Sequence, residues 1–308
     1  MSTPTTARLP KEVRALYPFR SRWVTVNGFR CHYVDEGSGD PVLMVHGNPT
    51  WSFFFRKLIE GLSPCYRAIA PDHIGCGLSE KPHPQAYDFR LSSRINDLRQ
   101  LIASLNLDRK LSLILHDWGG MIGMAYAVAY PENIGRIVIM NTAAFPPPTG
   151  KSIPLRLELV RRIRPFAAPA VLGLNIFARA ALYMAAAKTL AAPVKKGLLA
   201  PYDSWHNRRA ILKFVQDIPL SPKHPSYAVV KQTAESLHLL ARIPILILWG
   251  KRDFVFDPDY LEAWQKRFPS ASVHVFDDAG HYLLEDAPEE ALNHIRRFLD
   301  QNPLDDTL

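Results

Sequence analysis

The architecture of this chain can be inferred from Leu111-Ser-Leu-Ile-Leu-His-Asp117-Trp118-Gly119-Gly120-Met121. An apolar run, 111–115, stops at a polar pair, and two glycines then lead into small and apolar residues that are typical of a helix. The pattern predicts a buried strand, a sharp turn and a helix, with one side chain presented at the apex of the turn. The apical residue is Asp117, so we expect a carboxylate where serine or cysteine is the usual nucleophile.

A carboxylate at the apex limits the reactions that the site can catalyse. Its attack on an ester carbonyl would produce an anhydride. Asp117 is therefore better suited to attack a saturated carbon that carries a weakly basic leaving group, and the product would be an alkyl ester of the enzyme.

Short apolar runs alternate with helical patterns on both sides of this stretch. Strands are predicted at 41–45, 66–70, 134–140, 243–249 and 272–276, and helices at 51–62, 90–105, 259–268 and 288–299. Residues 23–34 indicate a hairpin closed at Asn27-Gly28, and three prolines in 1–20 indicate an arm without a continuous helix. The alternation predicts an α/β fold with a mostly parallel, doubly wound sheet.

The alternation is interrupted once. From about residue 146 to 227 no strand is apparent, and the composition is rich in alanine, leucine, arginine and proline. We expect an inserted helical cap, 146–227, between two parts of the core, 1–145 and 228–308. The apolar helix faces of the cap would line a cavity or pack on one another. Charged and polar residues interrupt 165–200, so a membrane span is not expected there.

Composition and charge limit the classes of function that the chain can have. The chain has 308 residues, 47% of them hydrophobic and 21% charged, as expected of a globular protein with a full core. The net charge is +8, and residues 151–200 alone contain nine Lys or Arg residues and one acidic residue, Glu158. No nucleic-acid-binding motif accompanies this charge. It indicates either a solvated helix face or a contact surface for an acidic partner or a membrane.

The cysteines and the amino terminus bear on location and cofactors. Cys31, Cys65 and Cys76 have no metal-ligand spacing and are expected to be reduced thiols. The first residues have no apolar signal-peptide region. We therefore expect a cytoplasmic protein, with membrane association left open. No motif implies a metal or an organic cofactor.

Two further residues complete a candidate catalytic triad with Asp117. Asp253 and His281 each follow a predicted strand, where open α/β sheets assemble their sites. In the chain order 117, 253, 281, His281 would activate water or orient an intermediate, and Asp253 would hold the imidazole tautomer. Asp257 is a competing acid. Asn141 occupies another position where this kind of sheet can place the acid, but an amide cannot serve as one.

The remaining candidates surround the nucleophile. Asn48 and Trp118 would supply backbone N–H groups to an oxyanion hole, and their side chains could hold an anionic leaving group. His116 would point away from the site and have a structural role. Four aromatic residues are candidates for the substrate pocket or for plain packing: Phe145, Phe177, Tyr183 and Trp205.

These motifs resemble the aspartate-nucleophile branch of the α/β-hydrolase superfamily. Segments 46–56, 72–79, 117–120 and 278–281 are similar to haloalkane dehalogenase motifs and extend over the whole core. The resemblance implies an α/β-hydrolase fold with an inserted cap. It also implies that Asp117, Asp253 and His281 are nucleophile, acid and base.

The cap segment 201–226 most closely resembles the β-lactone decarboxylases of bacterial olefin biosynthesis. That resemblance implies conversion of a cis-3,4-dialkyl-β-lactone to a cis-alkene and CO2. The substrate would be apolar with long alkyl chains, and the basic cap would meet partner enzymes of the same pathway or a membrane. Haloalkane dehalogenase, epoxide hydrolase and a non-catalytic binding module remain as alternatives.

Overall fold

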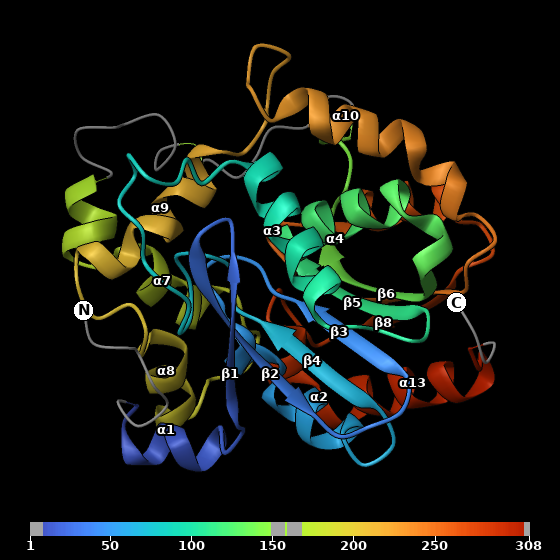
Figure 1. Cartoon of the computed structure of the whole chain (residues 1–308), viewed down its shortest axis with the longest axis horizontal. Helices are drawn as coiled ribbons and strands as arrows, with labels where there is room; N and C mark the ends of the chain where they lie inside the picture. The colour runs from blue at the N-terminus through green and yellow to red at the C-terminus, as the bar shows by residue number, and fades with distance from the viewer. Residues whose placement is uncertain (1–8, 149–157, 159–167, 305–308) are drawn as a thin grey trace.

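The computed structural model describes residues 9–148, 158 and 168–304, and it contains one eight-stranded sheet (Figure 1). The strands lie in the order β1-β2-β4-β3-β5-β6-β7-β8. Their bounds are β1 Ser21–Val26, β2 Phe29–Glu36, β3 Pro41–Val45, β4 Arg67–Pro71, β5 Leu111–Asp117, β6 Ile134–Thr142, β7 Ile245–Gly250 and β8 Ser272–Phe276. β2 is antiparallel to β1 and β4, and the other strands are parallel. The predicted fold class is confirmed.

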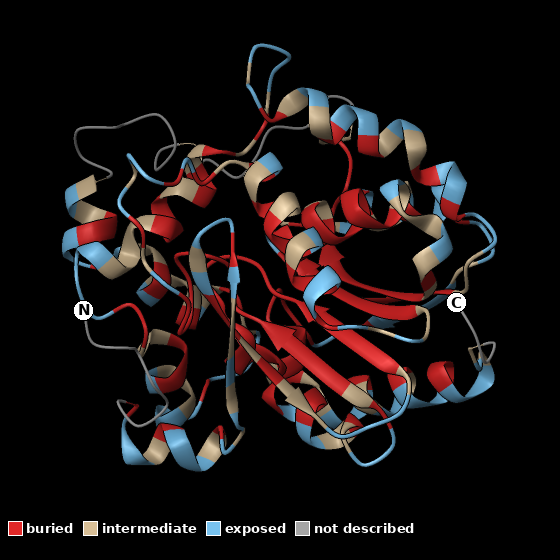
Figure 2. Ribbon diagram, in the orientation of Figure 1, coloured by how far each residue is buried: buried red, intermediate tan, exposed pale blue. Residues whose placement is uncertain are grey.

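The central strands are buried on both faces, as parallel strands covered by helices must be (Figure 2). Side chains of β3 alternate between the two faces. Val42 and Met44 pack in one apolar cluster, and Leu43 and Val45 pack in the other. The predicted hairpin is present, with Asn27 and Gly28 both at positive φ, as a tight two-residue turn requires.

Helices cover both faces of the sheet (Figure 1). One face carries α3, α4, α10 and α11, and the other carries α2, α12 and α13. Their bounds are α2 Arg56–Leu62, α3 Leu91–Ser104, α4 Trp118–Ala129, α10 Tyr227–Ser236, α11 Pro258–Arg267, α12 Leu283–Asp286 and α13 Pro288–Gln301. A short 3-10 helix, η2 Ser52–Phe55, precedes α2. The predicted helices of the core are thus present, within two residues of their expected bounds.

Between β6 and β7 the described residues form helices and no strand. They include a π-helical turn at Pro169–Gly173, α7 Ile176–Met184, α8 Ala192–Leu199, α9 Arg209–Gln216 and then α10. Helices α7 to α9 lie together at one end of the sheet, whereas α10 packs on α4 (Figure 1). Five basic residues of the expected cap surface lie outside the described residues: Lys151, Arg156, Arg161, Arg162 and Arg164. No helix in the described ranges has the length and apolar composition to cross a bilayer.

The described part of the amino-terminal arm, residues 9–20, packs on the rest of the molecule. Residues Lys11–Leu16 form α1, which packs on α8, and both Val13 and Tyr17 are buried. The Tyr17 hydroxyl is hydrogen-bonded to Ser52 Oγ at 2.6 Å. The arm therefore joins the core to the helices of the inserted region.

Candidate active site

The turn between β5 and α4 places Asp117 in a strained conformation. Asp117 has φ 51° and ψ −126°, a region that costs a non-glycine residue about 1–3 kcal/mol and is often found at functional sites. The two following glycines permit the turn. A Cβ on Gly119 would collide with the carbonyl of Val45, and one on Gly120 would collide with the side chain of Thr142. The predicted elbow therefore forms, with Asp117 at its apex.

The Asp117 carboxylate is held between backbone donors and an imidazole. The N–H of Asn48 donates to Oδ1 at 2.6 Å, and Oδ2 lies 3.6 Å from Nε2 of His281. Burial raises the pKa of Asp117, while His281 and the N–H groups of Asn48 and Trp118 act in the opposite direction. The backbone groups expected to form an oxyanion hole thus already meet the carboxylate.

Asp253 holds the other side of the imidazole. Its Oδ2 lies 2.8 Å from Nδ1 of His281, and its Oδ1 accepts the backbone N–H groups of Val255 and Phe256. Burial acts to lower the pKa of His281, but the carboxylates of Asp253 and Asp117 outweigh it, so that this pKa lies above its ordinary value. With Nδ1–H donated to Asp253, Nε2 is the nitrogen that faces the nucleophile.

The competing acid lies elsewhere. Asp257 accepts the N–H of Asp259 at 3.1 Å and caps the start of α11. The structure therefore brings Asp253, and not Asp257, against His281. The catalytic role of the three residues remains a prediction that their geometry supports.

His116 lies behind the site, as expected. Its Nε2 is hydrogen-bonded to the backbone carbonyl of His281 at 2.8 Å, and its ring packs on Phe54 and on the His281 ring. Burial and the neighbouring His281 lower the pKa of His116 well below its ordinary value. A neutral His116 can thus hold the main chain of His281 without adding a second charge.

Asn48 joins the site to the helices that cover it. Its side-chain amide donates to the carbonyl of Ile211 in α9 at 3.2 Å. One amide proton is therefore engaged, and the other remains for the predicted contact with a leaving group. Trp118 packs on Phe214, also in α9, with ring centroids 5.2 Å apart.

An apolar cavity of about 420 Å³ opens above Asp117. Its polar lining comes from Asn48, Asp117, Trp118 and His281, with Tyr260 and Tyr282. The rest is mainly aliphatic and aromatic and includes Pro49, Met121, Phe145, Val171, Ile176, Phe177, Ala180, Ala181, Met184, Ala185, Val215, Leu220, Val230, Phe254 and Phe256. Such a cavity suits a substrate with alkyl chains, since apolar surface is removed from water on both sides.

Two of the four aromatic pocket candidates line this cavity and two do not. Phe145 and Phe177 are part of the wall. Tyr183 is 72% exposed and lies under the Lys195 ammonium, and Trp205 is 47% exposed and lies beside Gly173. The expectation for Tyr183 and Trp205 is corrected. Tyr183 follows the exposed Arg179 by one turn of α7, and Trp205 lies outside α7, directly before the 3-10 helix His206–Arg208.

Asn141 has a role that was not predicted from the sequence. It is the penultimate residue of β6, beside Gly250 of β7, and its amide contacts Asp253. The signal in the sequence was a polar residue, Asn141, directly after the predicted strand 134–140. It was weighed there only as a possible acid of the triad and not as a partner of that acid.

Several known proteins are similar to this chain over most of its length. The family described as alpha/beta hydrolase fold matches residues 40–288. A cis-3-alkyl-4-alkyloxetan-2-one decarboxylase of Shewanella oneidensis is 46% identical over 285 residues, covering 92% of this chain and 89% of the relative. Haloalkane dehalogenase 2 of Mycobacterium tuberculosis is 33% identical over 287 residues, covering 92% and 96%. Among solved structures, a haloalkane dehalogenase from Agrobacterium tumefaciens C58 superposes with TM-score 0.82 at 23% identity, covering 92% and 97%.

Proposed function

The chain belongs to the alpha/beta hydrolase family, and from this premise we propose that it decarboxylates cis-3,4-dialkyl-β-lactones to cis-alkenes and CO2. The observation that carries the proposal is an aspartate at the elbow, facing a cavity whose remaining wall is mainly apolar. The 46% identical decarboxylase supports the same reaction, whereas the dehalogenase relative is more distant at 33%.

The first step forms an ester and opens the ring. An oxygen of Asp117 attacks C4, the saturated ring carbon bonded to oxygen, and the C4–O bond breaks with its electron pair going to the departing carboxylate. The free side-chain donors at Asn48 and Trp118 would hold that carboxylate. A carboxylate is a weak nucleophile, but it can open this ring because the reaction releases ring strain and the leaving group is a weak base.

The second step removes CO2. The bond between C3 and the carboxylate carbon breaks, its electron pair forms the C3=C4 double bond, and the bond from C4 to Asp117 breaks to regenerate the carboxylate. No water is consumed and no proton is transferred. Attack from the back inverts C4, and anti elimination from the inverted ester places both alkyl groups on the same side. The two steps therefore give a cis-alkene from a cis-lactone.

His281 would stabilise charge in this reaction without acting as a base. Its pKa is raised by Asp253, which increases the imidazolium fraction near neutral pH. An imidazolium 3.6 Å from Asp117 attracts the regenerated carboxylate but cannot accept a proton from water. In this proposal the imidazolium form of His281 favours elimination over hydrolysis of the ester.

Product analysis tests the proposal. The purified protein is incubated with a cis-3,4-dialkyl-β-lactone and, in parallel, with a 1-haloalkane, and the products are measured by gas chromatography and halide release. We expect cis-alkene from the lactone. Asp117→Asn should lower the rate by about 10⁴-fold or more, whereas Asp203→Asn, at an exposed position, should not.

Three results would contradict the proposal. Halide and alcohol without any alkene would make the protein a dehalogenase. Alkene formation that persists unchanged in Asp117→Asn would exclude Asp117 as the nucleophile. Turnover of neither substrate, with specific binding of a partner, would favour the binding module.

We also propose that the basic surface of the inserted region meets the partner or membrane that supplies the substrate. Among its described cations, Lys188 donates to the carbonyl of Asp286 and Lys196 pairs with Glu12, whereas Lys195 lies over the exposed ring of Tyr183. Binding to anionic vesicles or to a pathway enzyme that weakens as salt is added would support this surface. Salt-independent binding would argue against it.

A further inference from the structure

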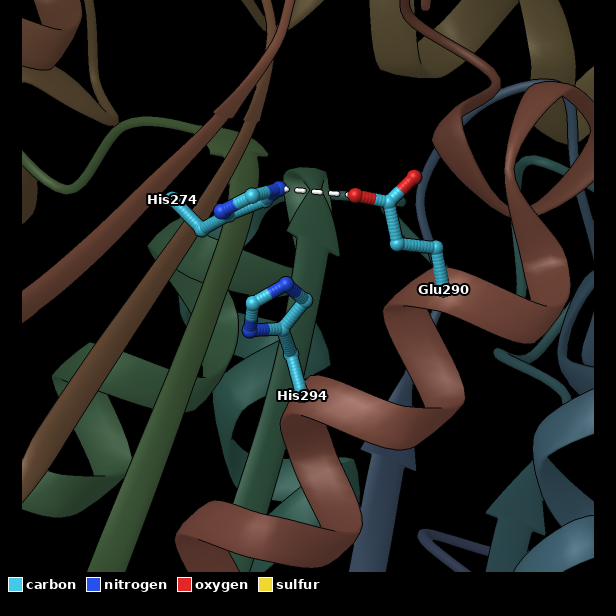
Figure 3. A group of neighbouring side chains, drawn as sticks. All are labelled: His274, Glu290 and His294. Carbon is cyan, nitrogen blue, oxygen red and sulfur yellow. Dashed lines mark hydrogen bonds and ion pairs between the residues drawn. The ribbon is translucent and has the colours of Figure 1, made fainter.

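Three side chains with metal-ligating atoms meet on the face of the sheet opposite to α4. His274 lies in the edge strand β8, and Glu290 and His294 lie one turn apart in α13 (Figure 3). Nε2 of His274 is 3.0 Å from Oε1 of Glu290, and a candidate ligand atom of each residue lies within 4.8 Å of the other two. None of these residues lines the cavity above Asp117.

We propose that His274, Glu290 and His294 bind one divalent transition-metal ion, with Zn²⁺ as the best match. Two imidazoles and one carboxylate are a common ligand set for Zn²⁺, whereas Mg²⁺ and Ca²⁺ require oxygen ligands. Ligands about 2.0–2.2 Å from a tetrahedral ion are about 3.3 Å apart, close to the separation between His274 and Glu290.

The fold sets up this arrangement. Residues 290 and 294 are on the same side of a helix because they are four positions apart, and α13 packs along the sheet so that this side faces β8. The ring of His274 packs against Phe276 with centroids 4.5 Å apart, and it meets the ring of His294 at 3.9 Å. Figure 3 shows all three side chains directed towards a common point.

The exposure of the ligands suits metal binding. Glu290 is exposed and both histidines are partly so, which leaves a fourth position open to a water molecule from solvent.

The ion would act on the catalytic loop without touching the substrate. His274 precedes His281 by seven residues, and Glu290 follows it by nine. A metal bridging His274 and Glu290 therefore fixes both ends of the segment that carries the imidazole. A ligand that binds the folded state alone stabilises it by mass action, so this segment would open less readily with metal bound.

Thermal unfolding with and without metal tests the inference. The full chain, without a histidine tag and stripped with EDTA, is heated in ZnCl2, CoCl2 or MgCl2. Zn²⁺ at about a hundredfold excess over its Kd should raise Tm by about 5 °C, and Mg²⁺ should not. Co²⁺ should give the visible absorption of a tetrahedral complex.

Variants separate this site from other metal-binding groups. His294→Ala and Glu290→Gln should weaken Zn²⁺ binding at least tenfold in equilibrium dialysis, while His238→Ala, at an exposed histidine outside the cluster, should not. Cys65→Ser removes the exposed thiol as a competing ligand. The inference is overturned if the wild-type protein shows no Zn²⁺-dependent Tm shift. It is also overturned if Glu290→Gln and His294→Ala bind as tightly as the wild type.

Discussion

The side-chain amide of Asn141 donates a 2.9 Å hydrogen bond to Oδ2 of Asp253, the same oxygen that faces Nδ1 of His281. Asn141 also bonds both backbone groups of Gly250, at the end of the neighbouring strand. Its position is thus fixed by the pairing of β6 with β7. Asn141 restricts Asp253 to the rotamer that holds the imidazole, so it is a positioning residue for the site.

Replacing Asn141 should slow turnover without affecting substrate binding. In Asn141→Ala, Asp253 loses a hydrogen bond to a charged acceptor, worth about 1.5–3 kcal/mol, so kcat should fall about 10- to 100-fold at an unchanged KM. Steady-state kinetics with the lactone provides the measurement. The matched control, Asn293→Ala at an exposed position of α13, should retain full activity. A rise in KM alone would contradict this role.

The pH dependence should distinguish elimination from hydrolysis. Asp117 must be ionised to attack, and burial raises its pKa, so activity should fall as the pH drops through a value above the ordinary range of aspartate. Hydrolysis also requires neutral His281, and its rate would rise as the pH increases through the raised pKa of that imidazole. Elimination has no such requirement, so kcat/KM for the lactone should not show this second rise.

Labelled water provides an independent check on the same distinction. In H₂¹⁸O, hydrolysis of an alkyl ester of Asp117 places ¹⁸O in the carboxylate, whereas elimination returns the original oxygens. Mass spectrometry of the peptide containing Asp117 after many turnovers should detect no incorporation with the lactone. Label in that peptide would show that water attacks the ester.

Reducing the volume of the cavity should lower activity more for long-chain lactones than for short-chain ones. Ala181 lines the cavity from α7, and Ala181→Phe would fill part of its volume. We expect kcat/KM to fall more than about tenfold for long-chain lactones and much less for short-chain ones, because each buried methylene contributes about 0.8 kcal/mol. Ala192→Phe, at an exposed position on α8, is the control. An equal loss for all chain lengths would indicate general damage to the site.

The elbow, the strands and the candidate triad could be predicted because their signals are local. An apolar run that ends in Asp117 and two glycines specifies a strand, a turn and a helix without reference to the rest of the chain. Asp253 and His281 followed from the rule that such sheets gather functional groups at the carboxyl ends of strands.

The features that were missed depend on tertiary pairing. Asn141 and Asp253 are 112 positions apart and meet only because β6 pairs with β7. The cluster of His274, Glu290 and His294 requires the packing of a strand on a helix. The position of Trp205, which precedes the 3-10 helix His206–Arg208, likewise depends on how the inserted helices pack together. For Tyr183 the local signal was a single charged residue, Arg179, on the exposed face of α7.

The hydrogen bond from the Asn48 side chain to the carbonyl of Ile211 links α9 to the loop that holds the nucleophile. The same residue donates its backbone N–H to Asp117. The loop that carries Asn48 therefore contacts both the nucleophile and α9, the helix that covers it. A displacement of α9 that widened the cavity would break this bond and release the amide next to the nucleophile. The position of α9 would therefore determine which amide donors of Asn48 are available to a leaving group at Asp117.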